Sequence, residues 1–345
     1  MSINPKKSKR FEGVKFLYVD DERDNLIAFE QQFDSVFEIL SETDPKKALE
    51  TIQKEENLGV LLVDQIMPKM TGLELAAEAK KIRPSVICIM ITGNATKKLA
   101  MDSIKNHAFW DFLEKPINFS STEIRQLFVD AFQEYLMGKL KRDYHFGTVQ
   151  LLSQLIDDKD GHTQRHSERV TDWALKIAKK FNLSDKEMIQ IREGALLHDI
   201  GKVSIPDDIL KKPGRLSALE RKIIMTHPAR GGYLLERVPQ LRELAPIARF
   251  HHERPDGNGY PKGLKGEEIP LLASIVALAD FFEALSAKRP YKDPWAISDI
   301  VAEIARVRGE QFPEECVDAL FTVIEEEGLL EHEKVIEILK TTKAA

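Results

Sequence analysis

The sequence predicts an open, parallel α/β sheet in the first half of the chain, joined by a helix to an all-α second half. Three observations support this prediction. Short, β-rich apolar runs alternate with segments of helical periodicity in the first half, whereas the pattern from Thr148 onward is helical. A chain of 345 residues is also too long for one typical domain, so two domains are expected.

Five apolar runs of the first half are candidate strands. Residues 14–20, 60–64 and 86–92 are strongly β-rich and predict buried parallel strands, and residues 37–43 and 109–115 are weaker candidates. The segments with helical periodicity between them are residues 25–33, 45–55 and 72–82. This alternation predicts helices on both faces of the sheet and a ligand site beyond the carboxyl ends of the strands.

Polar residues stand at those strand ends. They are Asp20, Asp21, Asp64, Thr92 and Lys115. Three carboxylates at one edge would repel one another without a cation, and Mg²⁺ suits oxygen ligands of this kind. The lysine adds a charge for a phosphoryl group, and the threonine adds a hydroxyl. Taken singly, each aspartate could also be a turn former or an N-cap, but the combination indicates a site.

The motifs YVDDE, LLVDQIMPKMTGLEL, MITG and FLEKP resemble the receiver domain of two-component response regulators, over about residues 12–135. The resemblance implies a flavodoxin-like sheet and a phosphoprotein. It implies that Asp64 accepts phosphate from a histidine kinase and that the other two carboxylates help it to hold Mg²⁺. Thr92 and Lys115 would contact the phosphoryl group, and Phe112 takes the place of the family's aromatic switch residue. Phosphate on an aspartate adds charge that can reorder nearby loops.

A long helix is predicted between the two halves, because residues 121–157 contain no proline and two glycines, Gly138 and Gly147. Either glycine could break it, and residues 136–157 are taken as the linker. Two alternatives remain open. The helix could pair with a second copy to form a homodimer, or it could pack on its own sheet and then begin the next domain. The spacing does not sustain the heptads of a coiled coil.

Composition excludes several classes of function. The net charge of −6 and the pI near 5.9 give no footprint for nucleic acid, and no basic recognition helix follows the first domain. Cys88 and Cys316 form no motif, so a disulfide framework is not expected and a cytoplasmic location fits. The basic start has no apolar signal region. The most apolar run, residues 271–285, is too short and polar for a membrane span.

The second half concentrates histidines next to acidic residues. In EGALLHDIGK, His198 and Asp199 follow an apolar helical face, where unpaired polar groups would be costly to bury. A hydrogen bond between these two side chains at a helix end would be the simplest explanation. Neighbouring helical residues diverge by about 100°, however, so the pair suits a site with more than one metal, bridged by the aspartate.

The stretch HHERPDGNGYP fits the same site. Its two imidazoles diverge, and its glycines, including Gly259 beside Tyr260, let the backbone approach a ligand closely. Taken singly, the other histidines could be surface residues, and the aspartate in SIVALADFF could be ion-paired. The predicted metal ligands are His166, His198, Asp199, His227, His251, His252 and Asp280. This mixture suits Fe, Mn, Zn or Co better than Ca or Mg alone.

The motifs HSERV, LLHDIGK, IPDDILKKPGRL, THPARGG, HHERPDGNGYPKGLKGEEIP and ALADFFEALSAKRPYK resemble the HD-GYP family of HD-domain phosphohydrolases. We place this domain at residues 158–325, followed by a helical tail at 326–345. The resemblance implies two Fe or Mn ions, bridged by Asp199, and hydrolysis of cyclic di-GMP. It places Lys202 near the bridging solvent, and the turn residues of the GYP motif, with Arg289 and Lys292, at the substrate.

The sequence departs from the family at a few positions. His162 stands where some members have a glutamate that binds a third metal, and it could be an extra ligand or a bystander. Ser274, Glu283 and Lys288 stand where Arg, Asp and Asp are frequent, which puts rate and substrate preference in doubt.

Three functions therefore remain open from the sequence. The first is a phosphorylation-regulated phosphodiesterase that opens cyclic di-GMP to pGpG, with GMP as the product of a second turnover. The second is an enzyme for another cyclic dinucleotide, such as cyclic GMP-AMP. The third is a non-catalytic signalling adaptor that binds nucleotides or proteins. Metal identity, the sign of phosphoregulation, the cognate kinase and the oligomeric state are not determined by the sequence.

Overall fold

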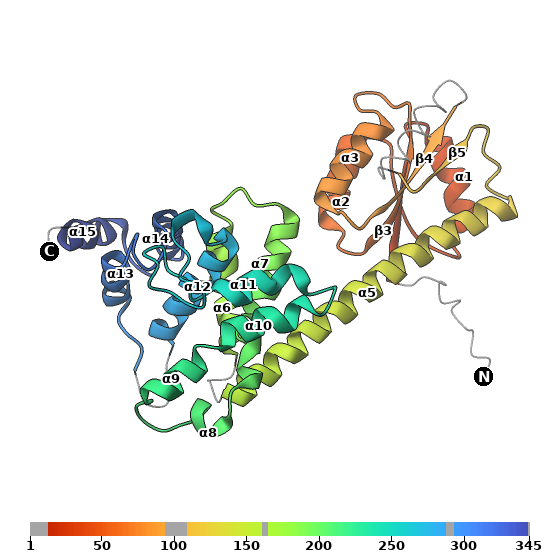
Figure 1. Cartoon of the computed structure of the whole chain (residues 1–345). Coiled ribbons are helices and arrows are strands. Elements are labelled where there is room, and N and C mark those ends of the chain that lie inside the picture. The colour runs from red at the N-terminus through yellow and green to blue at the C-terminus, as the bar shows by residue number, and fades with distance from the viewer. Residues whose placement is uncertain (1–12, 94–108, 161–164, 288–292, 344–345) are drawn as a thin grey trace, which may run out of the picture. The chain divides into compact units, whose positions relative to one another are not determined.

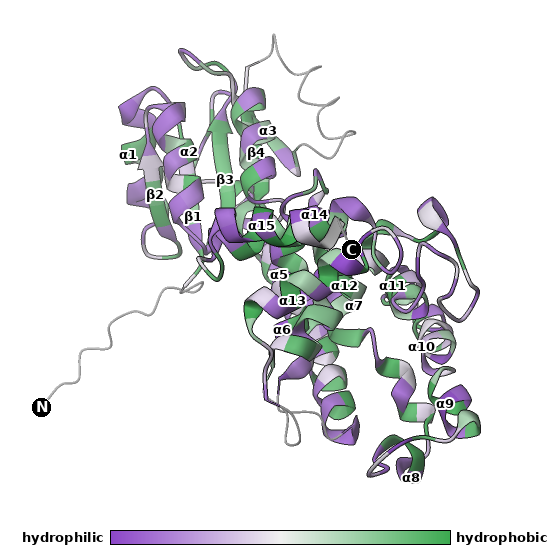
Figure 2. Ribbon diagram, turned by 90° about the vertical axis from the view of Figure 1, so that its left-hand side faces the viewer, coloured by the Kyte–Doolittle hydropathy of each residue, from purple (hydrophilic) through white to green (hydrophobic). Residues whose placement is uncertain are grey.

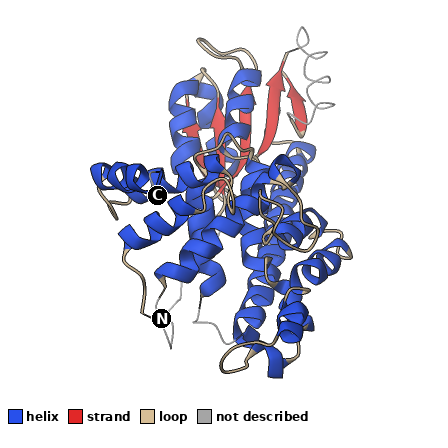
Figure 3. Cartoon of the chain, turned by 60° about the vertical axis from the view of Figure 1, so that its left-hand side comes forward, coloured by secondary structure: helices blue, strands red, loops and turns tan. Residues whose placement is uncertain are grey.

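The chain folds into two compact units, Met1–Tyr144 and His145–Ala345. The computed structural model describes residues 13–93, 109–160, 165–287 and 293–343 (Figure 1). Strands occur in the first unit, and the described part of the second unit is built from helices and loops (Figure 3). The predicted fold class, an α/β unit followed by an all-α unit, is confirmed.

The first unit contains one five-stranded parallel sheet in the order β2-β1-β3-β4-β5. This is the flavodoxin-like strand order. Its strands are β1 (Lys15–Val19), β2 (Glu38–Glu42), β3 (Leu58–Asp64), β4 (Ile87–Thr92) and β5 (Asp111–Glu114). All five predicted strands are present, including the two weaker candidates. β3 is buried along its whole length, as its uninterrupted apolar sequence predicts.

Helices cover both faces of this sheet, and β1 shows why. Phe16 and Tyr18 of β1 point into one apolar core, and Leu17 and Val19 point into another, because side chains alternate along a strand. The predicted helices are confirmed as α1 (Arg23–Phe33), α2 (Pro45–Lys54) and α3 (Gly72–Ile82). Thr71 begins α3 with a capping box to Glu74.

The joining segment is a single helix, α5 (Thr122–Asp160), and it continues through Gly138 and Gly147. A break at either glycine is therefore not present. Phe128 and Phe132, near the start of α5, belong to the aromatic core on one face of the sheet. Val149 and Ile156, near its end, belong to a core of the helical unit. The helix therefore packs on its own sheet and then begins the next domain, as the second alternative predicts. These contacts use one side of α5, and pairing with a second copy concerns its exposed side.

The helical unit surrounds α12 (Leu271–Ser286), whose buried face includes Ile275, Leu278 and Phe282. Figure 2 shows the hydrophobic character of this helix. The remaining elements are α6 (His166–Ala178), α7 (Asp185–Leu197), η2 (Ile200–Ser204), α8 (Asp207–Leu210), α9 (Ala218–Ile224), α10 (His227–Glu236), η3 (Arg242–Leu244), α11 (Ala245–Phe250), η4 (Gly266–Glu268), α13 (Ile297–Arg306), α14 (Glu314–Glu326) and α15 (His332–Lys343). The helical pattern predicted from Thr148 onward is confirmed. Among the described residues, no helix combines the length and apolar character that crossing a bilayer needs.

Candidate functional site

The carboxyl edge of the sheet brings three carboxylates together. Asp20 follows β1, Asp64 ends β3, and oxygens of Asp20, Asp21 and Asp64 lie within 4.8 Å of one another. Thr92 ends β4 at the same edge and is buried, and Lys115 directly follows β5. The five strand-end residues singled out in the sequence therefore share one edge, since parallel strands end side by side.

Two further side chains, which the sequence did not single out, fix Asp20. The Tyr18 hydroxyl donates to Asp20 Oδ2 at 2.7 Å, and Asn25 Nδ2 donates to the same oxygen at 3.0 Å. The backbone N–H of Glu22 donates to Asp20 Oδ1 at 2.9 Å. The one signal for Asn25 in the sequence is its place shortly after the strand-end aspartates, where α1 begins.

Asp64 faces a lysine. Lys115 Nζ lies 2.9 Å from Asp64 Oδ1. Burial raises the pKa of Asp64 in spite of Lys115, and Asp20 and Asp21 add to the rise. Burial alone would lower the pKa of Lys115, but Asp64 outweighs it and raises that pKa. Such a carboxylate beside a cation site can act as a nucleophile toward a phosphoryl group.

In the helical unit, helix ends carry most of the predicted metal ligands. His166 and His227 are the first residues of α6 and α10, and His198 and His251 directly follow α7 and α11. Ligand atoms within 4.8 Å of one another form three overlapping groups: His227, His251 and His252; His166, His198 and Asp280; and His198, Asp199 and His251. All seven predicted ligands thus converge, and the chemistry of this donor set fits two transition-metal ions.

A close approach between η2 and α10 helps to form this centre. A Cβ atom on Gly201 would lie 1.9 Å from the backbone oxygen of His227 and 2.6 Å from the backbone nitrogen of Gly231. No side chain can replace glycine there without moving α10 away. Gly201 therefore allows His227 to approach Asp199, to a distance of 3.0 Å between Nε2 and Oδ1.

Three of the imidazoles are held in one tautomer by backbone carbonyls three residues earlier. The Nδ1 atoms donate to Ala195 O from His198 at 2.7 Å, to Ile224 O from His227 at 2.8 Å, and to Ala248 O from His251 at 3.0 Å. Since Nδ1 carries the proton, Nε2 keeps its lone pair and is available to a metal. These carbonyls were not predicted, and the position of each histidine at a helix boundary was the only available signal.

Asp199 lies between the groups of imidazoles. Its Oδ2 is 3.2 Å from His198 Nε2, and its Oδ1 is 3.0 Å from His227 Nε2 and 3.8 Å from His251 Nε2. His198 Nε2 is buried, and its contact with Asp199 lacks hydrogen-bond geometry, so that nitrogen has no hydrogen-bond partner among the described residues. Burying a nitrogen without a partner lowers the stability of the fold. A metal ion bound to this nitrogen would remove that cost.

His166 is oriented by a residue outside the predicted set. Its Nδ1 donates to Glu283 Oε2 at 2.6 Å, and its Nε2 lies 3.3 Å from Asp280 Oδ1. Arg169 Nε donates to the other Glu283 oxygen at 2.7 Å. Burial disfavours the His166 imidazolium, but the two carboxylates outweigh it and raise the pKa of His166 to about 10. Glu283, one of the departures from the family pattern, thus orients the ring of a candidate metal ligand.

Lys202 is buried between two carboxylates. Its Nζ lies 2.7 Å from Asp199 Oδ2 and 2.5 Å from Asp160 Oδ2. Burial alone would raise the pKa of Asp199, but Lys202 and His198 hold it well below its usual range. Asp160, the last residue of α5, was not predicted as part of the site, because nothing local in its sequence marks it.

The turn after His252 closes the centre on one side. The ring of Tyr260 stacks on His252, with centroids 4.8 Å apart and an interplanar angle of 27°. The buried carboxylate of Glu253 accepts hydrogen bonds from the backbone of Lys262 and Leu264 and so holds the turn. At Gly259, a Cβ would lie 2.4 Å from the nitrogen of Arg254, so only glycine allows this turn. Burial lowers the pKa of His252 to about 4.

Three predicted site residues, His162, Arg289 and Lys292, lie outside the described residues, as does Lys288.

Comparison with known proteins defines the class of the chain. A family model described as "Response regulator receiver domain" matches residues 16–127, and one described as "HD domain" matches residues 150–314. Together with the flavodoxin-like sheet and its acidic edge, these matches define a response regulator with an HD output domain. The chain belongs to the family of response regulators that join an N-terminal receiver domain to a C-terminal HD-GYP domain.

Relatives match both units. The chain is 33% identical over 318 residues to a "Cyclic di-GMP phosphodiesterase" of Thermotoga maritima, covering 85% of each protein. It is 34% identical over 336 residues to the "Cyclic di-GMP phosphodiesterase response regulator RpfG" of Xanthomonas campestris, covering 89% of this chain and 87% of that one. A "3'3'-cGAMP-specific phosphodiesterase 2" of Vibrio cholerae is 40% identical over 171 residues, 49% of this chain and 33% of the relative.

Proposed function

We propose that the protein hydrolyses cyclic di-GMP to linear pGpG at the centre formed by the five histidines and two aspartates, with GMP as the product of a second turnover. The centre would hold two iron or manganese ions, and phosphorylation of Asp64 would regulate it. Two relatives that match most of the chain carry the name of this activity. The proposal applies that activity to the HD-GYP domain, taken at residues 158–325.

One observation carries this proposal. His198, His227 and His251 each donate Nδ1–H to a carbonyl of their own chain segment, and their Nε2 atoms lie 3.0–3.8 Å from carboxylate oxygens of Asp199. His227 Nε2 and His251 Nε2 lie 3.4 Å apart, and since Nδ1 carries the proton in both rings, neither nitrogen has a hydrogen to donate to the other. A cation bound by both lone pairs would stabilise this arrangement. A non-catalytic adaptor would not need all seven ligand positions, and all seven are filled.

The chain's own residues would prepare the reaction. Two bound cations of this kind lower the pKa of water and neutralise charge on phosphoryl oxygens. We infer that His166, His198 and Asp280 hold one ion and that Asp199 bridges to the other, which the remaining three histidines hold. Lys202, buried beside Asp199, would place positive charge next to the attacked phosphate. Tyr260 and Gly259 would seat the substrate against His252, since they form the turn stacked on that ring.

The test is an anaerobic purification followed by metal analysis and separation of the nucleotide products. We expect about two iron or manganese ions per chain and conversion of cyclic di-GMP to pGpG. A protein that binds these metals fully but opens no cyclic dinucleotide would be an adaptor, and the proposal would be wrong.

A second candidate substrate is 3'3'-cyclic GMP-AMP. The observation that favours it is the 40% identity, over 171 residues, between this chain and a relative named for that substrate. Parallel assays with cyclic di-GMP, 3'3'-cyclic GMP-AMP and cyclic di-AMP at equal concentrations, compared as kcat/KM, would decide between the two. We expect the highest value for cyclic di-GMP.

We propose that the receiver domain, taken at residues 12–135, regulates this activity, and its acidic edge supports the proposal. A histidine kinase would phosphorylate Asp64 with Mg²⁺ held by Asp20 and Asp21, and Lys115 and Thr92 would contact the phosphoryl group. The added charge would reorder the edge, and α5, which contributes to the receiver core, would transmit the change. Turnover with and without beryllofluoride tests this, with Asp64→Asn as the control. Equal turnover with and without beryllofluoride would show that the receiver domain does not regulate hydrolysis.

We also infer a homodimer through α5. Five large apolar side chains on this helix are exposed: Met137, Leu140, Tyr144, Leu151 and Leu155. Their separations of three, four or seven residues place them along one side of the helix. Light scattering of the wild type and of a Leu140→Glu/Leu151→Glu variant tests the dimer. We expect a dimer for the wild type and a monomer for the variant.

A further inference from the structure

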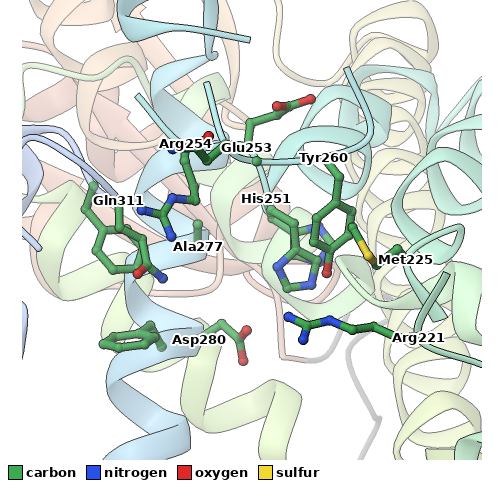
Figure 4. A pocket seen from close by; sticks show the side chains of 14 residues that line it. Arg221, Met225, His251, Glu253, Arg254, Tyr260, Ala277, Asp280 and Gln311 are labelled. Atoms are coloured by element: carbon green, nitrogen blue, oxygen red, sulfur yellow. The ribbon is translucent and has the colours of Figure 1, made fainter. Parts of the chain in front are cut away.

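A pocket of about 340 Å³ adjoins the histidine and aspartate centre (Figure 4). This volume falls in the range of roughly 300–1,000 Å³ that small-molecule sites occupy. The side chains of His251, His252 and Asp280 form part of its wall. A ligand seated in the pocket would therefore contact the metal centre directly.

The wall away from these ligands is largely apolar and partly aromatic. Its apolar members are Met225, Ala277, Phe281 and Phe312. The rings of Phe281 and Phe312 contact each other, with centroids 5.2 Å apart and an interplanar angle of 52°. Tyr260 adds a third aromatic side chain to the wall. Such a surface suits a flat, π-bearing group, because a base packs well against aromatic side chains.

Two polar side chains of this wall already form hydrogen bonds with other protein groups. Arg254 Nε and Nη2 are bound by the two carboxylate oxygens of Asp256, at 3.1 and 2.5 Å. Glu253 accepts two backbone hydrogen bonds from its own turn. These groups hold the pocket in shape and have little capacity left for a ligand.

Gln311 and Arg221 differ from them. Within the described part of the chain, the Gln311 carboxamide makes no hydrogen bond and the Arg221 guanidinium makes no ion pair. Figure 4 shows both side chains directed into the pocket, Gln311 from one side and Arg221 from the other. Each thus offers polar atoms to a ligand.

The backbone around Gln311 is fixed. Its N–H donates to Val307 O at 2.8 Å, and Gly309 N donates to Phe312 O at 2.8 Å. The neighbouring carbonyl of Glu310 accepts from the N–H of Asp256 at 3.0 Å, which ties this turn to the turn that carries Tyr260. A side chain on such a braced turn is preorganised, and this lowers the entropy lost when a ligand binds.

We propose that this pocket is a purine subsite of the substrate, in which Gln311 reads the edge of the base and Arg221 binds the charge of the phosphate. The inference rests on the proposed cyclic dinucleotide hydrolase. A carboxamide offers an acceptor beside a donor, and purine edges present complementary pairs. The base would pack against Phe281 and Phe312. A guanidinium suits phosphate oxygens.

The test changes what Gln311 can accept and donate. In Gln311→Glu the side chain only accepts, so it still suits guanine, whose Watson–Crick edge carries two adjacent N–H donors. It no longer suits adenine, which places an acceptor beside a donor. We expect the ratio of kcat/KM for cyclic di-GMP to that for cyclic di-AMP to rise roughly tenfold to a hundredfold. Gln240→Glu, an exposed glutamine of the same unit, is the matched control and should leave the ratio unchanged.

Arg221→Gln gives an independent reading. We expect KM to rise about tenfold for all cyclic dinucleotides with metal content unchanged, and Arg230→Gln on the surface of α10 serves as its control. If the wild type cleaves cyclic dinucleotides while the Gln311 and Arg221 variants keep the wild-type ratio and KM, the subsite is wrong and the hydrolase stands. If the wild type cleaves none, both proposals fall.

Discussion

At the sheet edge of the receiver domain, Asp20, Asp21 and Asp64 meet because neighbouring parallel strands end at one edge. In the HD-GYP domain, the imidazoles and carboxylates come from α6, α10 and α12 and from the residues directly after α7 and α11, and they meet through helix packing. The first site consists of oxygen ligands that suit Mg²⁺, and the second is rich in nitrogen ligands that suit transition metals.

The two sites also differ in how their ligands are supported. At the receiver edge, Asp20 and Asp64 are each in contact with hydrogen-bonding side chains, and Asp21 is exposed. In the HD-GYP centre, backbone carbonyls fix three imidazoles and Glu283 fixes a fourth. The proposed phosphorylation of Asp64 would need access for a phosphodonor. The proposed metal centre would benefit from ligands held rigidly before the ions bind.

The largest expected effect concerns the HD-GYP centre alone. His198→Ala or Asp199→Ala should lower hydrolysis by roughly 10³-fold or more, about 4 kcal/mol in the barrier, and should remove bound metal. The reason is that His198 and Asp199, with His251, form the group of candidate ligands that links the other two groups. Metal analysis and product assays measure the effect. His332→Ala, an exposed histidine paired with Glu325, is the control and should behave as wild type. Full activity in a metal-poor double variant would exclude the proposed centre.

The next effect tests whether the support of the ligands matters. Glu283→Ala should weaken metal binding about 10–100-fold, because His166 loses the carboxylate that orients its ring. Glu283→Gln should be milder, since an amide oxygen still accepts from Nδ1. Chelator competition with Mn²⁺ measures the affinity without reference to turnover. Glu303→Ala, which removes a partner of Arg306, is the matched control. An unchanged affinity in Glu283→Ala would show that packing alone orients His166.

A third prediction uses the pH dependence of stability in metal-free protein to test the burial of His252 in the HD-GYP centre. Burial lowers the pKa of His252 in the folded chain to about 4, whereas an exposed histidine has a pKa near 6.5. Below about pH 6.5 the unfolded chain therefore binds a proton that the folded chain does not bind. Between pH 6.5 and 4.5 this residue should remove about 2 kcal/mol of stability. In His252→Asn the loss should be smaller by that amount, whereas His332→Asn should match the wild type. Urea unfolding at both pH values measures the free energy of unfolding. An equal loss of this free energy in the wild type and in His252→Asn would contradict the burial argument.

The smallest expected effect concerns the receiver. In Mg²⁺-free buffer, Asp64→Asn should stabilise the receiver by about 1 kcal/mol, because it removes one of three crowded carboxylates whose burial raises the Asp64 pKa. Added Mg²⁺ should stabilise the wild type more than the variant. Thermal unfolding of the full chain, with and without Mg²⁺, measures both effects. Glu78→Gln on the exposed side of α3 serves as the control. If Asp64→Asn were less stable than the wild type, repulsion among the three carboxylates would not explain the raised pKa of Asp64.

Sequence reasoning succeeded where local pattern and topology suffice. The strand at residues 60–64 reads as buried because it is uninterrupted and apolar, and its last residue, Asp64, then falls at the ligand edge of any parallel sheet. The adjacent pairs His198-Asp199 and His251-His252 were conspicuous because polar residues interrupt apolar helical faces. Their convergence with Asp280 was inferred through resemblance to a family, since no local rule brings such distant positions together.

Sequence reasoning failed where a residue acts through a partner far along the chain. Glu283 appeared to be a departure from the family pattern, yet it bonds the ring of His166, 117 positions earlier. The sequence around Asp160 gives no indication of its contact with Lys202. The helix through Gly138 and Gly147 stays intact because glycine only weakens a helix, and packing of α5 at both of its ends outweighs that cost.

By itself, the sequence determined the two fold classes, the acidic strand ends and the seven candidate ligands, since periodicity and residue chemistry are local properties. Only the tertiary structure decided which nitrogen of each imidazole is available, which carboxylates support the ligands, and that Gln311 and Arg221 face one pocket. These features depend on distances between segments remote in sequence, which packing of the whole helical unit sets.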